Sequence, residues 1–120
     1  MGNNVVGSNE DAWLLIYNSG VYLRDGELGG ESYKTDFKMN QWYHIVFVAE
    51  DGMQKVYINN ENVGNLSVDY NFGSWYWDDY AYIGCEYWGK KDHFFKGIID
   101  DVRIYNRVLS EDEIDDLYNE

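Results

Sequence analysis

The sequence of 120 residues contains no proline and a single cysteine, Cys85. One cysteine cannot form an internal disulfide, so the fold must be held by packing and hydrogen bonds. Because Cys85 lies in the apolar stretch AYIGC, we interpret it as a small buried side chain; the alternative is a reactive thiol. Without proline, the turns must be made by Gly, Asn and Asp.

Basic residues are scarce. Nine Lys and Arg stand against 22 Asp and Glu, which gives a formal net charge of −13. Such a field repels phosphate backbones and anionic lipid, so nucleic acid and membrane surfaces are disfavoured as partners. It suits neutral ligands such as sugars, cationic partners or divalent cations. The alternative is that most of the charge is a solvated surface that aids solubility.

Long apolar runs are also missing, so the sequence predicts neither a membrane-spanning helix nor a signal peptide. The length predicts a single domain over residues 1–120, in which residues 1–12 form a loosely ordered leader or an edge strand. Aromatic residues are abundant, at 18% with 12 Tyr and 5 Trp. This exceeds what a small core needs, so we expect some rings on the surface, where they suit binding.

Short apolar runs separated by Gly, Asn and Asp predict a protein made mostly of strands. Residues 42–50 are apolar on both parities, which predicts a central strand. Turns are expected at residues 18–20, 50–52 and 59–60, and loops at 26–30 and 86–93. The predicted strands cover residues 13–17, 21–25, 32–37, 42–50, 53–58, 63–68, 81–85 and 94–109.

A short helix is predicted at the end of the chain, over residues 111–118. Ser110 and Glu113 have the spacing of a capping box, and the acidic first turn complements the helix dipole. Ile114 and Leu117 are expected to dock on the body. Many short strands and one terminal helix predict the all-β class, a two-sheet antiparallel sandwich.

The run FFKGIIDDVRIYNRVL, residues 94–109, predicts one long strand covered on both faces, around which the chain is organised. Asp100 shares its parity with Val102 and Ile104, so we expect it to point into the core. A buried carboxylate must be paired, hydrogen-bonded or bound to metal. Calcium, which takes roughly six to eight oxygen ligands, is one interpretation of Asp100. The other is hydrogen bonds from backbone N–H groups, His44 or Arg103.

Residues 70–80, YNFGSWYWDDY, break the strand pattern with six aromatic residues and two aspartates. Aromatic faces cover the apolar faces of sugars, while carboxylates and amides bond their hydroxyls. We predict a ligand-binding surface here; the alternative is that alternate rings point into the core. The predicted binding residues are Trp75, Tyr76, Trp77, Asp78, Asp79, Tyr80, Tyr87 and Trp88.

Several motifs occur in one order: QWYHI at residues 41–45, DG at 51–52, VYINN at 56–60 and YIG at 82–84. Residues 95–114 then read F-x-G-x-I-D-D-V-R-I-Y-N-R-V-L-S-x-x-E-I. Together these motifs resemble the laminin G-like domains of the concanavalin A-like lectin family, and the resemblance covers roughly residues 13–118. It implies a jelly-roll sandwich, secreted or on a cell surface, that binds carbohydrate or another protein. Some members hold calcium.

The sequence departs from this family in two places. Members usually begin with further strands before the position of Trp13, including one that pairs beside the closing strand. Here little precedes Trp13, so we expect an open sheet edge that residues 3–7 partly fill, that a second chain fills, or that marks a truncated or minimal version. The aromatic stretch at residues 70–80 is also longer than the family's usual connection.

A catalytic apparatus is not predicted. Related sandwich glucanases carry E-x-D-x-x-E on a strand, whereas the similar string at residues 113–116 lies in the predicted helix and lacks the final Glu. His44 is interpreted as a hydrogen-bonded core histidine. The sequence therefore predicts a non-catalytic module that binds a neutral glycan through its aromatic loop. The alternative is a protein-interaction or self-assembly module that uses the same aromatics and the open edge, with a cell-surface protein or a second copy as partner.

Overall fold

The structure is a computed structural model that describes residues 12–17, 19–25, 29–68, 83–87, 91–92 and 94–120. Two antiparallel three-stranded sheets dominate the described chain. The first sheet contains β1 (Ala12–Tyr17), β2 (Gly20–Asp25) and β3 (Gly29–Lys34). The second contains β4 (Ile45–Glu50), β5 (Met53–Ile58) and β6 (Glu61–Ser67). The short strands β7 (Glu86–Tyr87) and β8 (Lys91–Asp92) pair with each other, and α1 (Glu111–Tyr118) follows.

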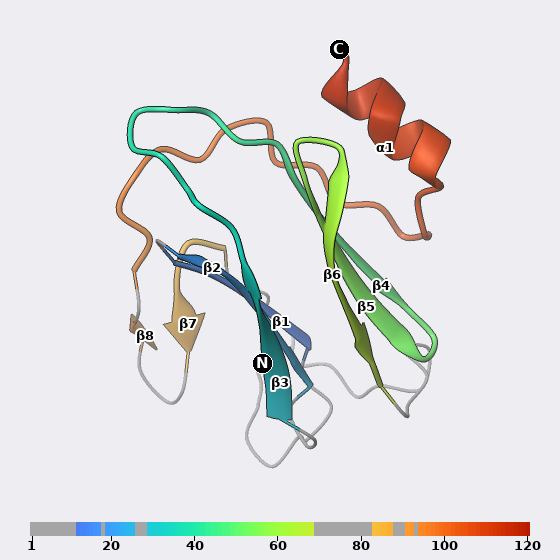
Figure 1. The fold of residues 1–120 in the computed structure, drawn as a ribbon, viewed down its shortest axis with the longest axis horizontal. Helices are drawn as coiled ribbons and strands as arrows, with labels where there is room; N and C mark the ends of the chain where they lie inside the picture. Colours follow the sequence, from blue (N-terminus) through green and yellow to red (C-terminus); the bar gives the residue numbers. More distant parts are fainter. Residues whose placement is uncertain (1–11, 18, 26–28, 69–82, 88–90, 93) are drawn as a thin grey trace.

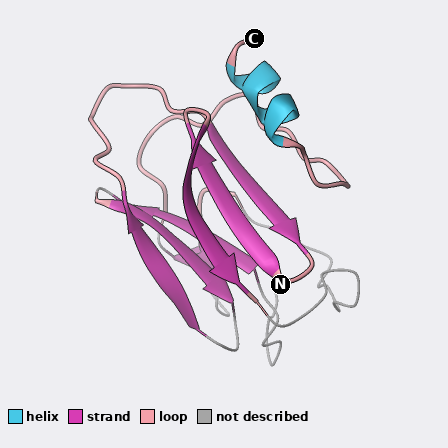
Figure 2. Cartoon of the chain, turned by 45° about the vertical axis from the view of Figure 1, so that its right-hand side comes forward, coloured by secondary structure: helices cyan, strands magenta, loops and turns pink. Residues whose placement is uncertain are grey.

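The two larger sheets face each other, and α1 lies beyond the second sheet (Figures 1 and 2). Val21 and Leu23 of β2 and Val56 and Ile58 of β5 form the core between the sheets. Each of these side chains is at most 5% exposed. The predicted two-sheet antiparallel sandwich with one C-terminal helix is therefore confirmed.

The second sheet is covered on both faces. Alternate residues of a strand point to opposite faces, so Tyr57 lies on the side opposite Val56 and Ile58. Tyr57 and Val48 form a second cluster with Ile114 of α1, which is 1% exposed. The apolar residues on both parities of β4 and β5 thus contact the first sheet on one side and α1 on the other.

The predicted turns of the second sheet are confirmed in their backbone angles. Gly52 joins β4 to β5 with φ 80°, and Asn59 and Asn60 join β5 to β6 with φ 49° and 66°. Two successive residues with positive φ match the twist of a tight hairpin, and Asn tolerates that conformation. Asn59 also accepts a hydrogen bond from the His44 amide through its side-chain oxygen, at 2.9 Å.

Tyr33 of β3 ties one sheet to the other. Its hydroxyl donates to the Asn65 carbonyl of β6 at 2.6 Å, and Glu31 Oε2 lies 3.1 Å away. Burial and the Glu31 carboxylate raise the pKa of Tyr33 to about 12, so the donor stays protonated. The ring lies directly over Gly64, where an added Cβ would stand 2.5 Å from Tyr33 Cδ2. Glycine at this position lets the two sheets approach.

Some predicted element boundaries are wrong. The strand expected at residues 42–50 begins only at Ile45, and it lies at an edge of the described sheet, whose centre is β5. The strand expected at 32–37 is Gly29–Lys34, because it pairs with the whole length of β2. Within the predicted strand 81–85, residues 83–85 are bends, and Cys85 is only partly buried.

The largest correction concerns residues 94–109, which form no strand. A strand needs a neighbour whose backbone groups complete its ladder, and apolar content alone does not supply one. Phe94, Ile98, Val102 and Ile104 are 55–82% exposed, whereas their odd-numbered neighbours Phe95, Ile99 and Tyr105 are 41–48% exposed. Both sets are therefore exposed, including the residues that share their parity with Asp100.

Asp100 is itself exposed, so its predicted burial is wrong. Its Oδ1 accepts a hydrogen bond from the Asp101 amide at 2.8 Å. This is the backbone alternative named for Asp100, and Arg103 pairs elsewhere. Asp101 has φ 53°, which bends the chain at this point.

Candidate functional site

The start of α1 is held by two interactions with the chain before it. The Ser110 hydroxyl accepts from the Glu113 amide at 3.1 Å, and Glu113 Oε1 accepts from the Ser110 amide at 3.0 Å. The predicted capping box is thus confirmed. Arg107 also donates to both oxygens of Glu113, at 2.8 and 2.6 Å. A forked pair of this kind fixes direction as well as distance.

The end of α1 is held in the same way. Arg103 donates to both carboxylate oxygens of Glu120, at 3.1 and 2.9 Å. The Tyr118 ring lies 5.9 Å from the His44 ring, between centroids. His44 is partly buried just before β4, and its Nδ1 has no hydrogen-bond partner among the described residues. The interpretation of His44 as a hydrogen-bonded core histidine therefore holds for its backbone, which bonds Asn59 through both its amide and its carbonyl, and not for Nδ1 of its ring.

The Arg107–Glu113 pair predicts a dependence of stability on pH. The Arg107 guanidinium, followed by the Ser110 amide, lowers the pKa of Glu113 from 4.5 to about 2. A carboxylate with a lowered pKa in the folded state stabilises the fold above its unfolded pKa, and this stabilisation is lost as the pH falls through the folded pKa. We expect the free energy of unfolding to fall less steeply between pH 4.5 and about 2 in Glu113→Gln than in the wild type.

Urea denaturation at a series of pH values measures this difference. The other carboxylates are common to both chains, so the difference in slope isolates Glu113. Parallel curves for the two chains would show that the pair contributes nothing.

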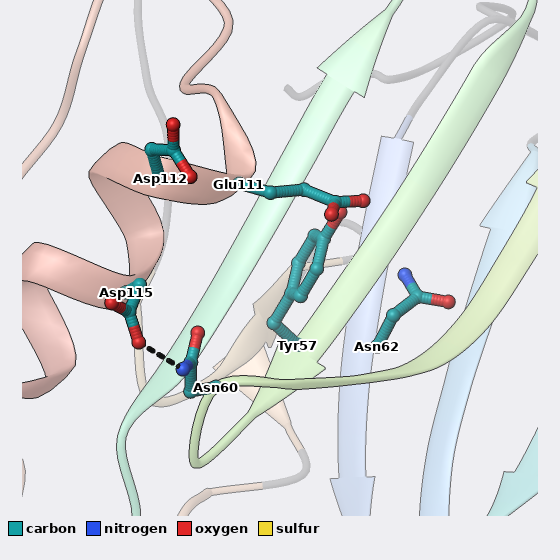
Figure 3. Close-up of a pocket in the computed structure, with 6 residues that line it drawn as sticks. All are labelled: Tyr57, Asn60, Asn62, Glu111, Asp112 and Asp115. Atoms are coloured by element: carbon teal, nitrogen blue, oxygen red, sulfur yellow. Dashed lines mark hydrogen bonds between the residues drawn. The ribbon is translucent and has the colours of Figure 1, made fainter.

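A pocket of about 310 Å³ lies between α1 and the second sheet (Figure 3). Residues from three elements line it. Tyr57 belongs to β5, Asn60 to the turn after it and Asn62 to β6, and the three acidic residues belong to α1. The lining consists of Tyr57, Asn60, Asn62, Glu111, Asp112 and Asp115.

Hydrogen bonds orient several of these side chains. Asn60 Nδ2 donates to Asp115 Oδ1 at 2.6 Å, which links the hairpin turn to the helix (Figure 3). Asn119 Nδ2 donates to the same oxygen at 3.1 Å. Asn62 and Asn65 form a reciprocal amide pair, at 3.1 and 2.9 Å. Three of the lining side chains, those of Asn60, Asn62 and Asp115, are therefore held in place by hydrogen bonds.

The chemistry of this lining suits an uncharged polar ligand. Amides both donate and accept hydrogen bonds, and carboxylates accept them. A ligand hydroxyl can bond to both kinds of group, because it also donates and accepts. Among the lining residues that the structure describes, none is basic and three carry carboxylates. A phosphate, sulfate or uronate would meet like charge here. The volume falls at the lower end of the roughly 300–1,000 Å³ that small-molecule sites occupy.

The structure does not test whether the predicted binding residues contribute to this pocket. Trp75, Tyr76, Trp77, Asp78, Asp79, Tyr80 and Trp88 lie outside the described residues. Tyr87 lies in β7. Their role in binding stays a prediction. At Asp100, calcium also stays a prediction, and the described residues contain no group of three or more side chains suited to a metal ion.

Sequence reasoning missed the pocket because its residues come from segments about fifty positions apart. The available signal was the polar run NNEN at residues 59–62 together with the acidic first turn of the helix. Each was explained locally, as a turn and as a complement to the helix dipole. The docking of Ile114 and the Asn60–Asp115 hydrogen bond bring them together.

Comparison with known proteins decides the family. The family model of the concanavalin A-like lectin/glucanases superfamily matches residues 2–115. The chain belongs to this superfamily. The resemblance to its laminin G-like members, drawn from the motifs, is thereby confirmed.

A solved structure of similar fold is that of an S-layer domain-containing protein, residues 221–444, from Clostridium thermocellum. It is 22% identical, with a TM-score of 0.55, and the match covers 98% of this chain and 68% of that one. At this identity the likeness extends to the fold alone. No curated protein matches the chain. No helix in the described part of the chain is both long and apolar enough to cross a membrane.

Proposed function

We propose that this domain is a non-catalytic recognition module that binds a neutral glycan in the pocket beside α1. The observation that carries the proposal is the composition of the described lining residues, which supply two amides and three carboxylates and include no basic group. This set offers partners to hydroxyl groups and repels anions. Membership of a superfamily that contains lectins supports the same class of ligand.

The proposal includes a place outside the cell or on its surface. Membership of the lectin superfamily and the fold shared with an S-layer domain-containing protein both support that location. The aromatic residues predicted to bind, Trp75 and Trp77 among them, remain a proposed second contact with the same ligand.

Pocket variants test the ligand class. We expect Asp112→Ala to weaken binding of neutral oligosaccharides about tenfold or more, because a hydrogen bond to a charged group contributes roughly 1.5–3 kcal/mol. Asn60→Gly should weaken it too, since glycine keeps the positive φ of the turn while removing the amide. Calorimetry with gluco-, manno- and galacto-oligosaccharides, with and without calcium, gives the affinities.

The matched control is Glu61→Gln, an exposed acidic residue next to the pocket but outside its lining. It should leave the affinity unchanged, and sulfated oligosaccharides should bind at least about tenfold more weakly than neutral ones. Binding that survives both pocket variants and fails in Trp75→Ala or Trp77→Ala would move the site to the aromatic loop. Equal affinity for the sulfated sugars would contradict the charge argument.

A second candidate function is protein interaction. It is favoured by the exposed apolar side chains of residues 94–109. Large apolar patches on a soluble protein mark interaction sites more often than single exposed residues do.

A further inference from the structure

The most apolar exposed surface of the described chain follows one segment. Between residues 94 and 109 large hydrophobic side chains are 41–82% exposed. These are Phe94, Phe95, Ile98, Ile99, Val102, Ile104, Tyr105 and Val108. We call this set the exposed ridge. The segment that carries it runs from β8 to the start of α1 (Figure 1).

The segment is anchored even though its apolar side chains are not covered. The Phe95 amide donates to the Gly84 carbonyl at 2.8 Å, and Ile99 Cδ1 lies 3.6 Å from where a Cβ on Gly84 would be. Arg107 is paired with Glu113 of α1, and Arg103 is paired with Glu120, two residues beyond the end of that helix. The ridge is thus a surface held in place at several points along its length.

The exposed apolar area of the ridge is close to the area that each partner buries in a standard protein–protein interface. A fully exposed large side chain presents roughly 150–200 Å², so the eight residues together expose on the order of 700 Å². A single monomer patch rarely exceeds about 600 Å². A standard interface buries about 800 Å² on each partner. A contact that buried this whole area on each copy would therefore approach the standard size.

The charges along the ridge indicate which partner fits. Residues 94–109 contain three basic and two acidic residues, whereas the whole chain carries −13. A basic partner would be drawn to the acidic remainder of the surface. The segment is instead nearly neutral, so two copies of a strongly acidic chain can meet there with little repulsion.

We propose that residues 94–109 are a self-association surface, on which a second copy of the chain docks its own residues 94–109 about a two-fold axis. Two-fold contacts between identical patches are the commonest way in which soluble chains pair. This proposal rests on the second candidate function, protein interaction, and names a second copy of the chain as the partner. It does not depend on the pocket. Because the two acidic bodies repel each other, dimerisation should strengthen as salt screens that repulsion.

Light scattering after size exclusion and sedimentation velocity test the proposal. We expect the wild type to form dimers at roughly 100 µM and above, since interfaces of this size reach micromolar affinity or better. The Ile98→Lys/Ile104→Lys variant should be monomeric, because these two side chains are 75% and 82% exposed. The matched control is Met39→Lys, which changes an 87% exposed side chain outside the ridge and should still dimerise.

Cross-linking tests the two-fold arrangement without a charged substitution. Cys85→Ser removes the native thiol, and Val102→Cys places a new one near the middle of the ridge, where each copy meets its counterpart. Within a dimer the two thiols react at an effective concentration of about a millimolar, so at roughly 100 µM protein, where dimers are expected, disulfide should form about tenfold faster than in a Lys34→Cys control.

A strict monomer at about 1 mM wild type would overturn the proposal, since even weak interfaces of this size associate there. So would a dimer that persists in Ile98→Lys/Ile104→Lys, or one that Met39→Lys disrupts equally. Equal oxidation rates for Val102→Cys and Lys34→Cys would exclude the two-fold contact. None of these results depends on glycan binding, so the pocket proposal stands or fails separately.

Discussion

Replacing Leu23 by alanine is expected to lower the free energy of unfolding by about 2–5 kcal/mol. Leu23 is fully buried in the core between the two sheets, beside Val21, Val56 and Ile58. Truncation leaves a cavity between the two sheets. The hydrogen bonds within each sheet keep its backbone rigid, so the sheets fill the cavity only in part. Domains of this size are stable by only about 5–15 kcal/mol, so the loss is a large share of the total.

Urea denaturation followed by circular dichroism measures this loss. Ser32→Ala is the control, because Ser32 lies on the neighbouring strand β3 with an exposed side chain and should change stability by less than about 0.5 kcal/mol. If Leu23→Ala unfolds at the same urea concentration as the wild type, the two sheets do not share this core.

Replacing Ile114 by aspartate is expected to release α1 from the sandwich. Ile114 is 1% exposed and packs against Val48 and Tyr57 on the outer face of the second sheet. The substitution removes an apolar contact whose loss costs about 2–5 kcal/mol. It also buries an unpaired carboxylate, which lowers the stability further. Because α1 supplies three of the six pocket residues, glycan binding should disappear together with the helix contact.

Urea denaturation measures the stability of this variant, and calorimetric titration with a neutral oligosaccharide measures its binding. Asp116→Ala, at an exposed position of the same helix, should alter stability by no more than about 0.5 kcal/mol. Should Ile114→Asp retain both stability and binding, the docking of α1 would not build the pocket.

Local chemistry explains which parts of the fold could be predicted. The turns at Gly52 and at Asn59-Asn60 depend on residues that tolerate positive φ, and the capping box depends on Ser110 and Glu113. In each case the deciding residues lie within a few positions of one another. Strand β5 was predicted with its observed bounds because a turn fixes each of its ends.

Features that depend on distant partners could not be predicted in this way. Residues 94–109 have the composition of a covered strand, but no ladder completes them in the described structure, and Asp100 is exposed as a result. The order of the second sheet, with β5 rather than β4 at its centre, likewise depends on which strand β6 pairs with. The pocket depends on Ile114 docking on a face whose exposure the sequence pattern does not reveal.

The central claim is that the pocket beside α1 binds an uncharged glycan. Nuclear magnetic resonance titration of the isotopically labelled chain with neutral oligosaccharides tests it most directly. The side-chain amide signals of Asn60 and Asn62 and the backbone signals of residues 111–115 should shift in a saturable way. Saturable shifts confined to the first sheet, or no shifts at millimolar sugar, would contradict it.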